Sequence, residues 1–337
     1  MASDIAAELA EQVARALADV SDVATLRAVE DGAFPRAAWD ALSGLGLAMA
    51  LVPEDAGGAG LGLADIAPVI EALGRVGAPA PLAEAIGAAA LLAAAGIAVP
   101  EDGVLTFAAA GAPVPWGRHA THVVLVDGAH VSLHDAAALR WTEGVNIARE
   151  PRDTLAASGA PLAQGTLPPA WGDDAARALA ALLRAGQMAG ALSAALALAV
   201  DHANTRKQFG RPIGRFQAVQ QQLALFAAES AAASVGAAAA ARAADARGLA
   251  DAAFEIGCAK VTAGEAAAQG AAIAHQVLAA MGITEEHALH HLTRRLWAWR
   301  EEGGTERFWS ARIGAAVQGA NAPLWTFITA RDEESAA

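Results

Sequence analysis

The chain has 337 residues and a formal net charge of −13 at neutral pH. This length is enough for two or three packed subdomains around a sizeable buried core. The acidic balance and the lack of a broad basic face argue against a nucleic-acid-binding protein. A local cluster of arginines can still bind an anionic ligand, so the charge is compatible with a small acidic cofactor or substrate.

Alanine supplies much of the 55% hydrophobic content. Because alanine has the highest helix propensity and little bulk, it predicts closely packed helices. The apolar runs 87–99 and 187–200 are shorter than the roughly 18–20 residues that cross a membrane, which predicts core helices and no membrane association. Cys258 has no partner for an internal disulfide, and the N-terminus lacks the pattern of a secretory signal. A cytoplasmic location is therefore expected.

Residues 1–100 predict an N-terminal helical domain. Apolar residues recur at three- and four-residue spacing from Ile5 to Leu17. Further helices are expected at about 35–47, 63–76 and 83–97, and the glycine-rich segment 52–60 predicts a loop between the first two of these.

Residues 101–170 differ in character and predict a small β domain. Short β-prone runs occur at 104–107, 122–126 and 130–133, and Asp127-Gly128-Ala129 between the last two is typical of a hairpin. Segment 141–147 is a candidate for one more strand.

Residues 171–337 predict long helices again, at about 173–205, 215–246, 250–280 and 286–298, and a last one from about 305. The expected fold class is mainly α with a small β insert. It consists of an N-terminal helical domain (1–100), a shortened middle β domain (101–170) and a C-terminal four-helix bundle domain (171–337).

Three motifs in a fixed order narrow this architecture. The first combines Leu51-Val52-Pro53-Glu54-Asp55 and the glycines after it with Ile70-Glu71-Ala72-Leu73-Gly74-Arg75. The second is Arg206-Lys207-Gln208-Phe209-Gly210-Arg211-Pro212-Ile213, followed by Phe216-Gln217-Ala218-Val219-Gln220. The third is the stretch from Gln276 to His287. Together they resemble the acyl-CoA dehydrogenase family over nearly the whole chain.

This resemblance implies a flavoenzyme scaffold for α,β-dehydrogenation of an acyl-CoA thioester. In the family, FAD takes a hydride from the substrate and a glutamate removes the Cα proton. The resemblance also implies a subunit partner, either a second copy of the chain or another acyl-CoA dehydrogenase subunit, because neighbouring subunits help to hold each other's FAD.

The resemblance assigns FAD contacts to the residues that match the family's flavin-binding positions: Arg206, Gln208, Phe209, Ile213, Phe216, Gln276, Val277, Ala280 and Thr305. Arg206 lies at a helix end before a turn, where its guanidinium can contact a diphosphate. An Arg-Lys-Gln run at a helix end is otherwise typical of a solvated C-terminus, but the flanking motif favours the flavin interpretation. For Gln276 two interpretations stay open, a cofactor contact or a buried glutamine that satisfies a backbone group.

The general base of the family is missing from both of its usual positions. When Gly304-Thr305 is aligned with the family's Gly-Thr, Gly303 occupies the base position, and Glu302 lies one residue early. Glu302 is therefore the one candidate catalytic residue, although a solvated acid at a helix end is the favoured interpretation. The second position, early in the first bundle helix, is occupied by Ala180 and Ala181.

Two further departures concern the flavin environment. Residues 104–118 differ from the loop that the family places beside the flavin ring. Ala279 and Ala280 stand where the family usually has paired glycines, and a methyl group there obstructs close approach of a phosphate to the backbone.

These departures resemble the short subunit of bacterial heteromeric acyl-CoA dehydrogenases, including those that shorten steroid side chains. The segment 287–300 resembles that group as well. The main hypothesis is a non-basic subunit of a heterotetramer that contributes FAD contacts to a partner chain. Two alternatives stay open, an active homo-oligomeric enzyme with a displaced base and a catalytically idle scaffold.

Histidines near residue 290 raise the question of a metal. His287 and His291 have the i, i+4 spacing of a zinc pair, but no third ligand is assigned. Structural histidines are the favoured interpretation, and no metal is expected.

Overall fold

The computed structural model describes residues 2–157, 159–320 and 322–333. Its N-terminal part is helical, and four helices lie close to the predicted segments: α1 (Ala2–Ala18), α3 (Arg36–Ser43), α4 (Leu63–Arg75) and α5 (Leu82–Ala94). One short helix, α2 (Val23–Glu30), was not predicted. It begins at Asp22, whose carboxylate accepts a hydrogen bond from the Thr25 backbone N–H at 2.7 Å, as an N-cap does.

The middle of the chain forms two small sheets. The first has the strand order β1 (Leu105–Ala109), β3 (His122–Asp127), β4 (His130–Asp135), β7 (Ala163–Thr166), in which β1 and β3 are parallel and the other pairs antiparallel. The second has the order β2 (Val114–Pro115), β6 (Arg152–Ala157), β5 (Arg140–Thr142). Strands β1, β3 and β4 lie in the β-prone runs of the sequence, whereas β2, β6 and β7 lie outside them and were not predicted. The strand expected over 141–147 was too long, because β5 ends at Thr142.

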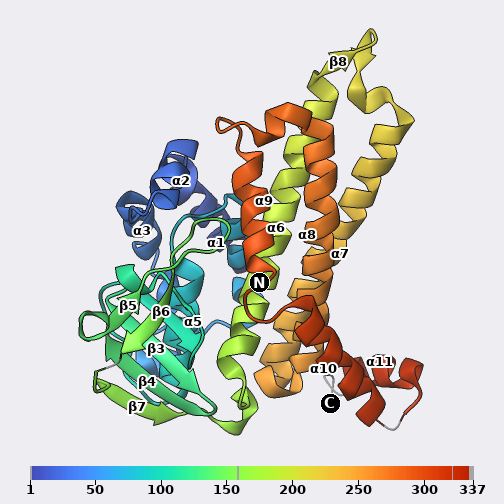
Figure 1. The fold of residues 1–337 in the computed structure, drawn as a ribbon. Coiled ribbons are helices and arrows are strands. Elements are labelled where there is room, and N and C mark those ends of the chain that lie inside the picture. Colours follow the sequence, from blue (N-terminus) through green and yellow to red (C-terminus); the bar gives the residue numbers. More distant parts are fainter. Residues whose placement is uncertain (1, 158, 321, 334–337) are drawn as a thin grey trace.

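The C-terminal part is a bundle of α6 (Ala175–Thr205), α7 (Gln217–Asp251), α8 (Ala253–Leu278) and α9 (Leu289–Trp299), which lie side by side in Figure 1. Two more helices follow, α10 (Glu306–Gly319) and α11 (Leu324–Glu333). Strands β8 (Lys207–Gln208) and β9 (Arg211–Pro212) form a hairpin between α6 and α7, at the end of the bundle far from the sheets. The expected fold class, mainly α with a small β insert, is confirmed. The domain boundaries near residues 100 and 170 stay a prediction.

Helix α4 joins the N-terminal helices to the bundle through very close backbone contact with α6. A Cβ atom at Gly190 would lie 1.9 Å from the Glu71 carbonyl oxygen, and one at Gly74 would lie 1.9 Å from the Gln187 carbonyl oxygen. Only glycine permits this distance between the two helix axes, because any side chain would overlap backbone that cannot move aside. These glycines fix the position of α6, on which the site described below is built.

Helices Ala175–Thr205, Gln217–Asp251 and Ala253–Ile283 are long and apolar enough, by length and composition alone, to cross a membrane. This finding corrects the inference drawn above from the shorter runs 87–99 and 187–200. In the structure 67%, 28% and 44% of the respective apolar windows are buried against the rest of the chain, so α7 has the smallest buried share of the three. The expected lack of membrane association stays a prediction.

Replacing Gly190 with alanine is expected to lower the free energy of unfolding by about 3 kcal/mol, because the added methyl overlaps the Glu71 carbonyl. Gly314→Ala is the matched control, since Gly314 is also helical and has open space around its Cβ position. It should stabilise by about 0.5–1 kcal/mol. Urea unfolding of both variants measures the difference, and equal effects would contradict the proposed contact.

Candidate functional site

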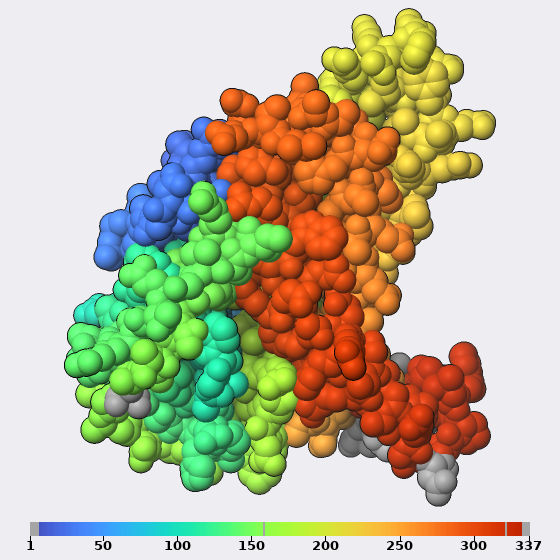
Figure 2. Space-filling view, viewed as in Figure 1, coloured from blue at the N-terminus to red at the C-terminus, as the bar shows by residue number. Residues whose placement is uncertain are grey.

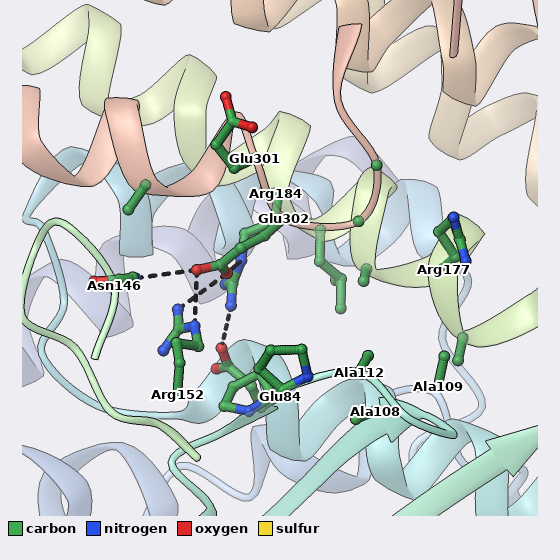
Figure 3. A pocket seen from close by; sticks show the side chains of 18 of the residues that line it. Glu84, Ala108, Ala109, Ala112, Asn146, Arg152, Arg177, Arg184, Glu301 and Glu302 are labelled. Atoms are coloured by element: carbon green, nitrogen blue, oxygen red, sulfur yellow. Dashed lines mark hydrogen bonds and ion pairs between the residues drawn. The ribbon is translucent and has the colours of Figure 1, made fainter. Parts of the chain in front are cut away.

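A cavity of about 990 Å³ lies where the three parts of the chain meet. Its walls come from α5, the β1–β2 segment, residues 144–152, the first half of α6 and the turn between α9 and α10. Figure 3 shows Glu84, Arg152, Arg184 and Glu302 together on one side of this cavity and Ala108, Ala109 and Ala112 on another. The cavity therefore combines an apolar wall with a charged one.

The charged wall is centred on Glu302. Arg152 donates two hydrogen bonds to its carboxylate, Nε to Oε1 at 2.7 Å and one terminal N–H to Oε2 at 3.0 Å. Arg184 Nε donates to Oε2 at 2.8 Å, and the Asn146 amide donates to Oε1 at 3.0 Å. Both oxygens of Glu302 are thus fully engaged. The favoured interpretation of Glu302 as a solvated acid at a helix end is wrong, because the paired side chain is only 20% exposed.

The same contacts decide the proton affinity of Glu302. Burial by itself raises the pKa of a carboxyl group, because it disfavours the charged form. Here the positive charges of Arg152 and Arg184, and the hydrogen bonds from Arg152 and Asn146, outweigh burial and lower the pKa of Glu302 to about 2. A carboxylate with so low a pKa is a weak base near neutral pH.

The charged wall continues into the interior as a ladder of alternating acids and arginines. Arg184 pairs with Glu84 on α5 at 2.5 Å, and Arg152 pairs with its neighbour Glu150 at 3.0 Å. The far side of Glu150 faces Arg295 of α9 at 3.2 Å. These groups are nearly all buried, and each charge faces an opposite one. The ladder therefore ties α5, β6, α6 and α9 together at the cavity floor.

The ladder reaches the surface at α2. There Glu30 accepts a hydrogen bond from Arg294 at 2.9 Å and contacts His291 Nδ1 at 2.8 Å. Arg294 also donates to the Ile147 carbonyl at 3.2 Å. This contact ties α9 to the segment 143–151, which reaches across to the orange-red C-terminal helices in Figure 2. Val145 and Ile147 on this segment are 58% and 63% exposed and form an apolar rim at the cavity.

The turn between α9 and α10 is held by three contacts. The Lys260 ammonium donates to the Arg300 carbonyl at 2.6 Å, and the Trp309 indole N–H donates to the Gly303 carbonyl at 2.9 Å. Arg300 also pairs with Glu306 at 2.8 Å. Because Lys260 is buried, its pKa falls to about 8. The turn that carries Glu302, Gly303 and Thr305 is thus fixed from α8 as well as from α10.

Both positions at which the family places its base meet at this turn. A Cβ atom at Gly303 would lie 2.5 Å from the Ala181 backbone nitrogen and 2.9 Å from the Ala180 carbonyl carbon. Gly303 also has a φ of +68°, a conformation that residues with a side chain rarely adopt. In the family, the acid lies either on this turn or on α6. Here the turn and α6 are in contact at these two positions, and Gly303, Ala180 and Ala181 carry no carboxylate.

The predicted cofactor residues of the second motif lie elsewhere, on the β8–β9 hairpin and its flanks. Arg206, Gln208 and Phe209 are exposed, Phe209 to 90%, whereas Ile213 and Phe216 are half-buried. At a rise of about 1.5 Å per residue, the stretch of α6 from Ala180 at the cavity to Thr205 at the hairpin is about 38 Å long. The hairpin is thus far from the cavity of its own chain.

The third motif ends at the same end of the bundle as the hairpin, at the C-terminus of α8 (Figure 1). Gln276 and Ala280 are exposed and Val277 is buried. The interpretation of Gln276 as a buried group is therefore wrong, and its role as a cofactor contact stays a prediction. Ala279 has φ +51° and ψ −135°, which is glycine-like backbone, at the place where the family has paired glycines.

Thr305 is the one predicted cofactor residue that lies at the cavity. Its side chain also caps α10, where it accepts a hydrogen bond from the Phe308 N–H at 3.3 Å. Of the two histidines with zinc-pair spacing, His291 contacts Glu30 at 2.8 Å and His287 Nδ1 accepts a hydrogen bond from the Leu289 N–H at 3.1 Å. The buried Nδ1 of His290 has no hydrogen-bond partner among the described residues. Within the described ranges no group of three or more His, Cys, Asp or Glu side chains could hold a metal ion.

The cavity arginines and Glu84 were not predicted as site residues from the sequence. A signal for them was present, because Glu84 and Arg184 are single charges inside long apolar helical runs. A lone charge on an apolar helix face has to find a buried partner or stay unsatisfied at high cost. What the sequence could not show is which partner, since Glu84 and Arg184 are 100 residues apart and Arg184 and Glu302 are 118 residues apart.

Glu302→Gln is expected to remove stability that depends on pH. The pKa of Glu302 is about 2 in the folded state and 4.5 without perturbation, so its charge stabilises the fold fully above about pH 4.5. This contribution, on the order of 3 kcal/mol, is lost as the pH falls from about 4.5 to 2. Unfolding of wild type and variant from pH 6 to pH 3 measures it. The exposed neighbour variant Glu301→Gln is the control, and a gap between wild type and Glu302→Gln that stays constant with pH would contradict the assignment.

Comparison with known proteins agrees with these observations. The family model for the acyl-CoA dehydrogenase N-terminal domain matches residues 3–99, and the model for the C-terminal domain matches residues 177–318. The acyl-CoA dehydrogenase IpdE2 of Mycobacterium tuberculosis (strain ATCC 25618 / H37Rv) is 32% identical over 304 residues, which are 85% of this chain and 89% of the relative.

Two solved structures share the fold over nearly the whole chain. The Tcur3481-Tcur3483 steroid ACAD, solved as a variant, has a TM-score of 0.83 and 25% identity, covering 96% of this chain and 100% of that one. The ChsE4-ChsE5 complex from Mycobacterium tuberculosis has a TM-score of 0.82 and 25% identity, covering 95% and 98%. With both family models matched in order and the same fold throughout, the chain belongs to the acyl-CoA dehydrogenase family.

Proposed function

We propose that this chain is a non-basic subunit of an FAD-dependent acyl-CoA dehydrogenase. The complete enzyme would catalyse α,β-dehydrogenation of an acyl-CoA thioester. This chain would supply the β8–β9 hairpin and the end of α8 to FAD held mainly by a partner subunit. The observation that carries the proposal is the contact of Gly303 with Ala180 and Ala181, which leaves both family base positions without an acid and without room for one at residue 303.

Glu302 does not replace the missing base in this proposal. Its carboxylate is surrounded by Arg152, Arg184 and Asn146 and has a pKa of about 2. Removing a Cα proton would require Glu302 to leave both arginines, and each of them would lose one of its two acidic partners in the interior. The role that these contacts support for Glu302 is structural. This weighs against the alternative of an active homo-oligomer with a displaced base.

The residues at the hairpin end suit the diphosphate of FAD. Arg206 is exposed and has no side-chain ion pair within the described part of the chain. An unpaired guanidinium next to the exposed Gln208 amide offers the charge-assisted hydrogen bonds that phosphate oxygens accept. The exposed ring of Phe209 is an apolar surface that a cofactor or a partner would cover. When bound, FAD supplies the hydride acceptor; the residues here supply binding and orientation.

A partner chain follows from the length of α6. The cavity and the hairpin are separated by about 38 Å of helix, further than the diphosphate of one FAD lies from its own isoalloxazine ring. The hairpin of this chain therefore serves a flavin bound at another chain's cavity. The similar ChsE4-ChsE5 structure is itself a complex of two differently named chains, which supports a heteromeric partner over a second copy.

The substrate class and location complete the proposal. The acyl group is proposed to be steroid-derived, because one similar solved structure is a steroid ACAD. A cytoplasmic location is proposed because the single cysteine suits a reducing compartment.

Coexpression with a second acyl-CoA dehydrogenase subunit tests the assignment. The expected result is a complex that binds FAD at fewer than one molecule per chain, whereas this chain purified alone is colourless. Flavin absorbance and native mass analysis measure both quantities. A stable homo-oligomer saturated with FAD, whose turnover is abolished by Glu302→Gln, would instead establish the active homo-oligomer. Lack of flavin in every combination would establish the idle scaffold.

A further inference from the structure

The β8–β9 hairpin has two faces of different composition. Lys207 pairs with Pro212 and Gln208 pairs with Arg211, and the Ile213 N–H donates to the Arg206 carbonyl at 2.8 Å beyond them. Because side chains alternate between the faces of a strand, one face carries Arg206, Gln208, Arg211 and Ile213, and the other carries Lys207 and Pro212. Three of the four residues on the first face match cofactor positions of the family. Arg211 is the exception.

Arg211 is held in place by its neighbours. Its guanidinium lies over the ring of Phe216 at 4.3 Å from the centroid, and Phe216 packs edge-on against Phe209 at 6.2 Å. The turn between the strands has positive φ at Phe209 and Gly210, +50° and +78°, which is the geometry of a tight two-residue hairpin. Stacking restricts the arginine without using its N–H donors, so a ligand finds them already oriented.

The charges on this hairpin are unusual for the chain. Arg206, Lys207 and Arg211 are exposed, and none of their side chains has an ion pair among the described residues, in a protein of net charge −13. Arg206 and Arg211 are diagonal neighbours across the two strands, a position at which long side chains still meet. Gln208 lies directly opposite Arg211. The side chains of two arginines and one glutamine thus leave the hairpin on the same face.

We propose that Arg211 is a second diphosphate ligand, so that Arg206 and Arg211 form a two-arginine clamp on the diphosphate of the partner's FAD. The inference rests on the proposed function, because it takes FAD as the ligand of this end of the bundle. Each guanidinium matches one phosphate, since two adjacent phosphates carry two negative charges that one arginine satisfies only in part. Lys207, with the same charge on the opposite face, takes no part in the clamp.

Three matched substitutions in the purified complex test the clamp: Arg206→Met, Arg211→Met and Lys207→Met. Methionine keeps an unbranched apolar stem, which at residue 211 can still pack against the Phe216 ring, but it removes the charge. The dissociation constant of FAD is measured by flavin absorbance at two salt concentrations, and the melting temperature and stoichiometry of each complex are recorded. Arg206→Met and Arg211→Met should each weaken FAD binding by about 10- to 100-fold. These two variants should also reduce the salt dependence of FAD binding, whereas Lys207→Met should bind FAD nearly as tightly as wild type.

Other outcomes separate the clamp from the proposed function. If Arg206→Met weakens FAD binding and Arg211→Met behaves as Lys207→Met, the clamp is overturned and the proposed function stands. If all three variants weaken FAD binding equally, the loss comes from the lower positive charge of the hairpin as a whole, and the clamp is again overturned. If neither arginine affects FAD in a flavin-containing complex, the proposed function fails together with the clamp. Arg211→Lys, which keeps charge but not the planar fork, should recover binding only in part.

Discussion

A cluster of buried charges, centred on one carboxylate between two arginines, connects the three parts of this chain. Glu302 comes from the turn after α9, Arg184 from α6 and Arg152 from β6, and Glu84 of α5 and Glu150 extend the same ladder. Each of these charges has been taken out of water, so each depends on the others for its solvation. The position of the sheets relative to the bundle is therefore fixed by charge pairing as well as by apolar packing. The same pairing gives the cavity its charged wall.

This arrangement changes what the cavity can do. In a dehydrogenase of this family the cavity needs a carboxylate with a free lone pair near the substrate. Here the carboxylate of Glu302 is paired with an arginine on each side, and the neighbouring backbone at Gly303 lies against α6. The acid has thus become part of the framework. The hairpin proposed to contact the cofactor lies at the other end of α6, so the length of one helix separates it from this framework.

Much of the fold follows from local sequence. The helices α6 to α10 were predicted to within a few residues, because alanine-rich apolar spacing and the intervening glycines and prolines are local signals. Strand β6 was missed for a physical reason: it begins with Arg152 and Asp153, which are buried because Arg152 meets Glu302 and Asp153 meets Arg118. Two consecutive charged residues indicate a loop when only the sequence is known, because their distant partners in the fold cannot be seen. Resemblance indicated the hairpin residues, but only the strand register shows that Arg211 shares a face with Arg206.

The contact of Gly303 with α6 has a consequence for substitutions at this position. A glutamate at position 303 would place its Cβ 2.5 Å from the Ala181 backbone nitrogen. Restoring an acid at residue 303 would therefore cost stability, whatever its effect on activity. No single substitution there introduces a carboxylate unless the turn or α6 also moves. The position is thus closed by packing and not only by the absence of one side chain.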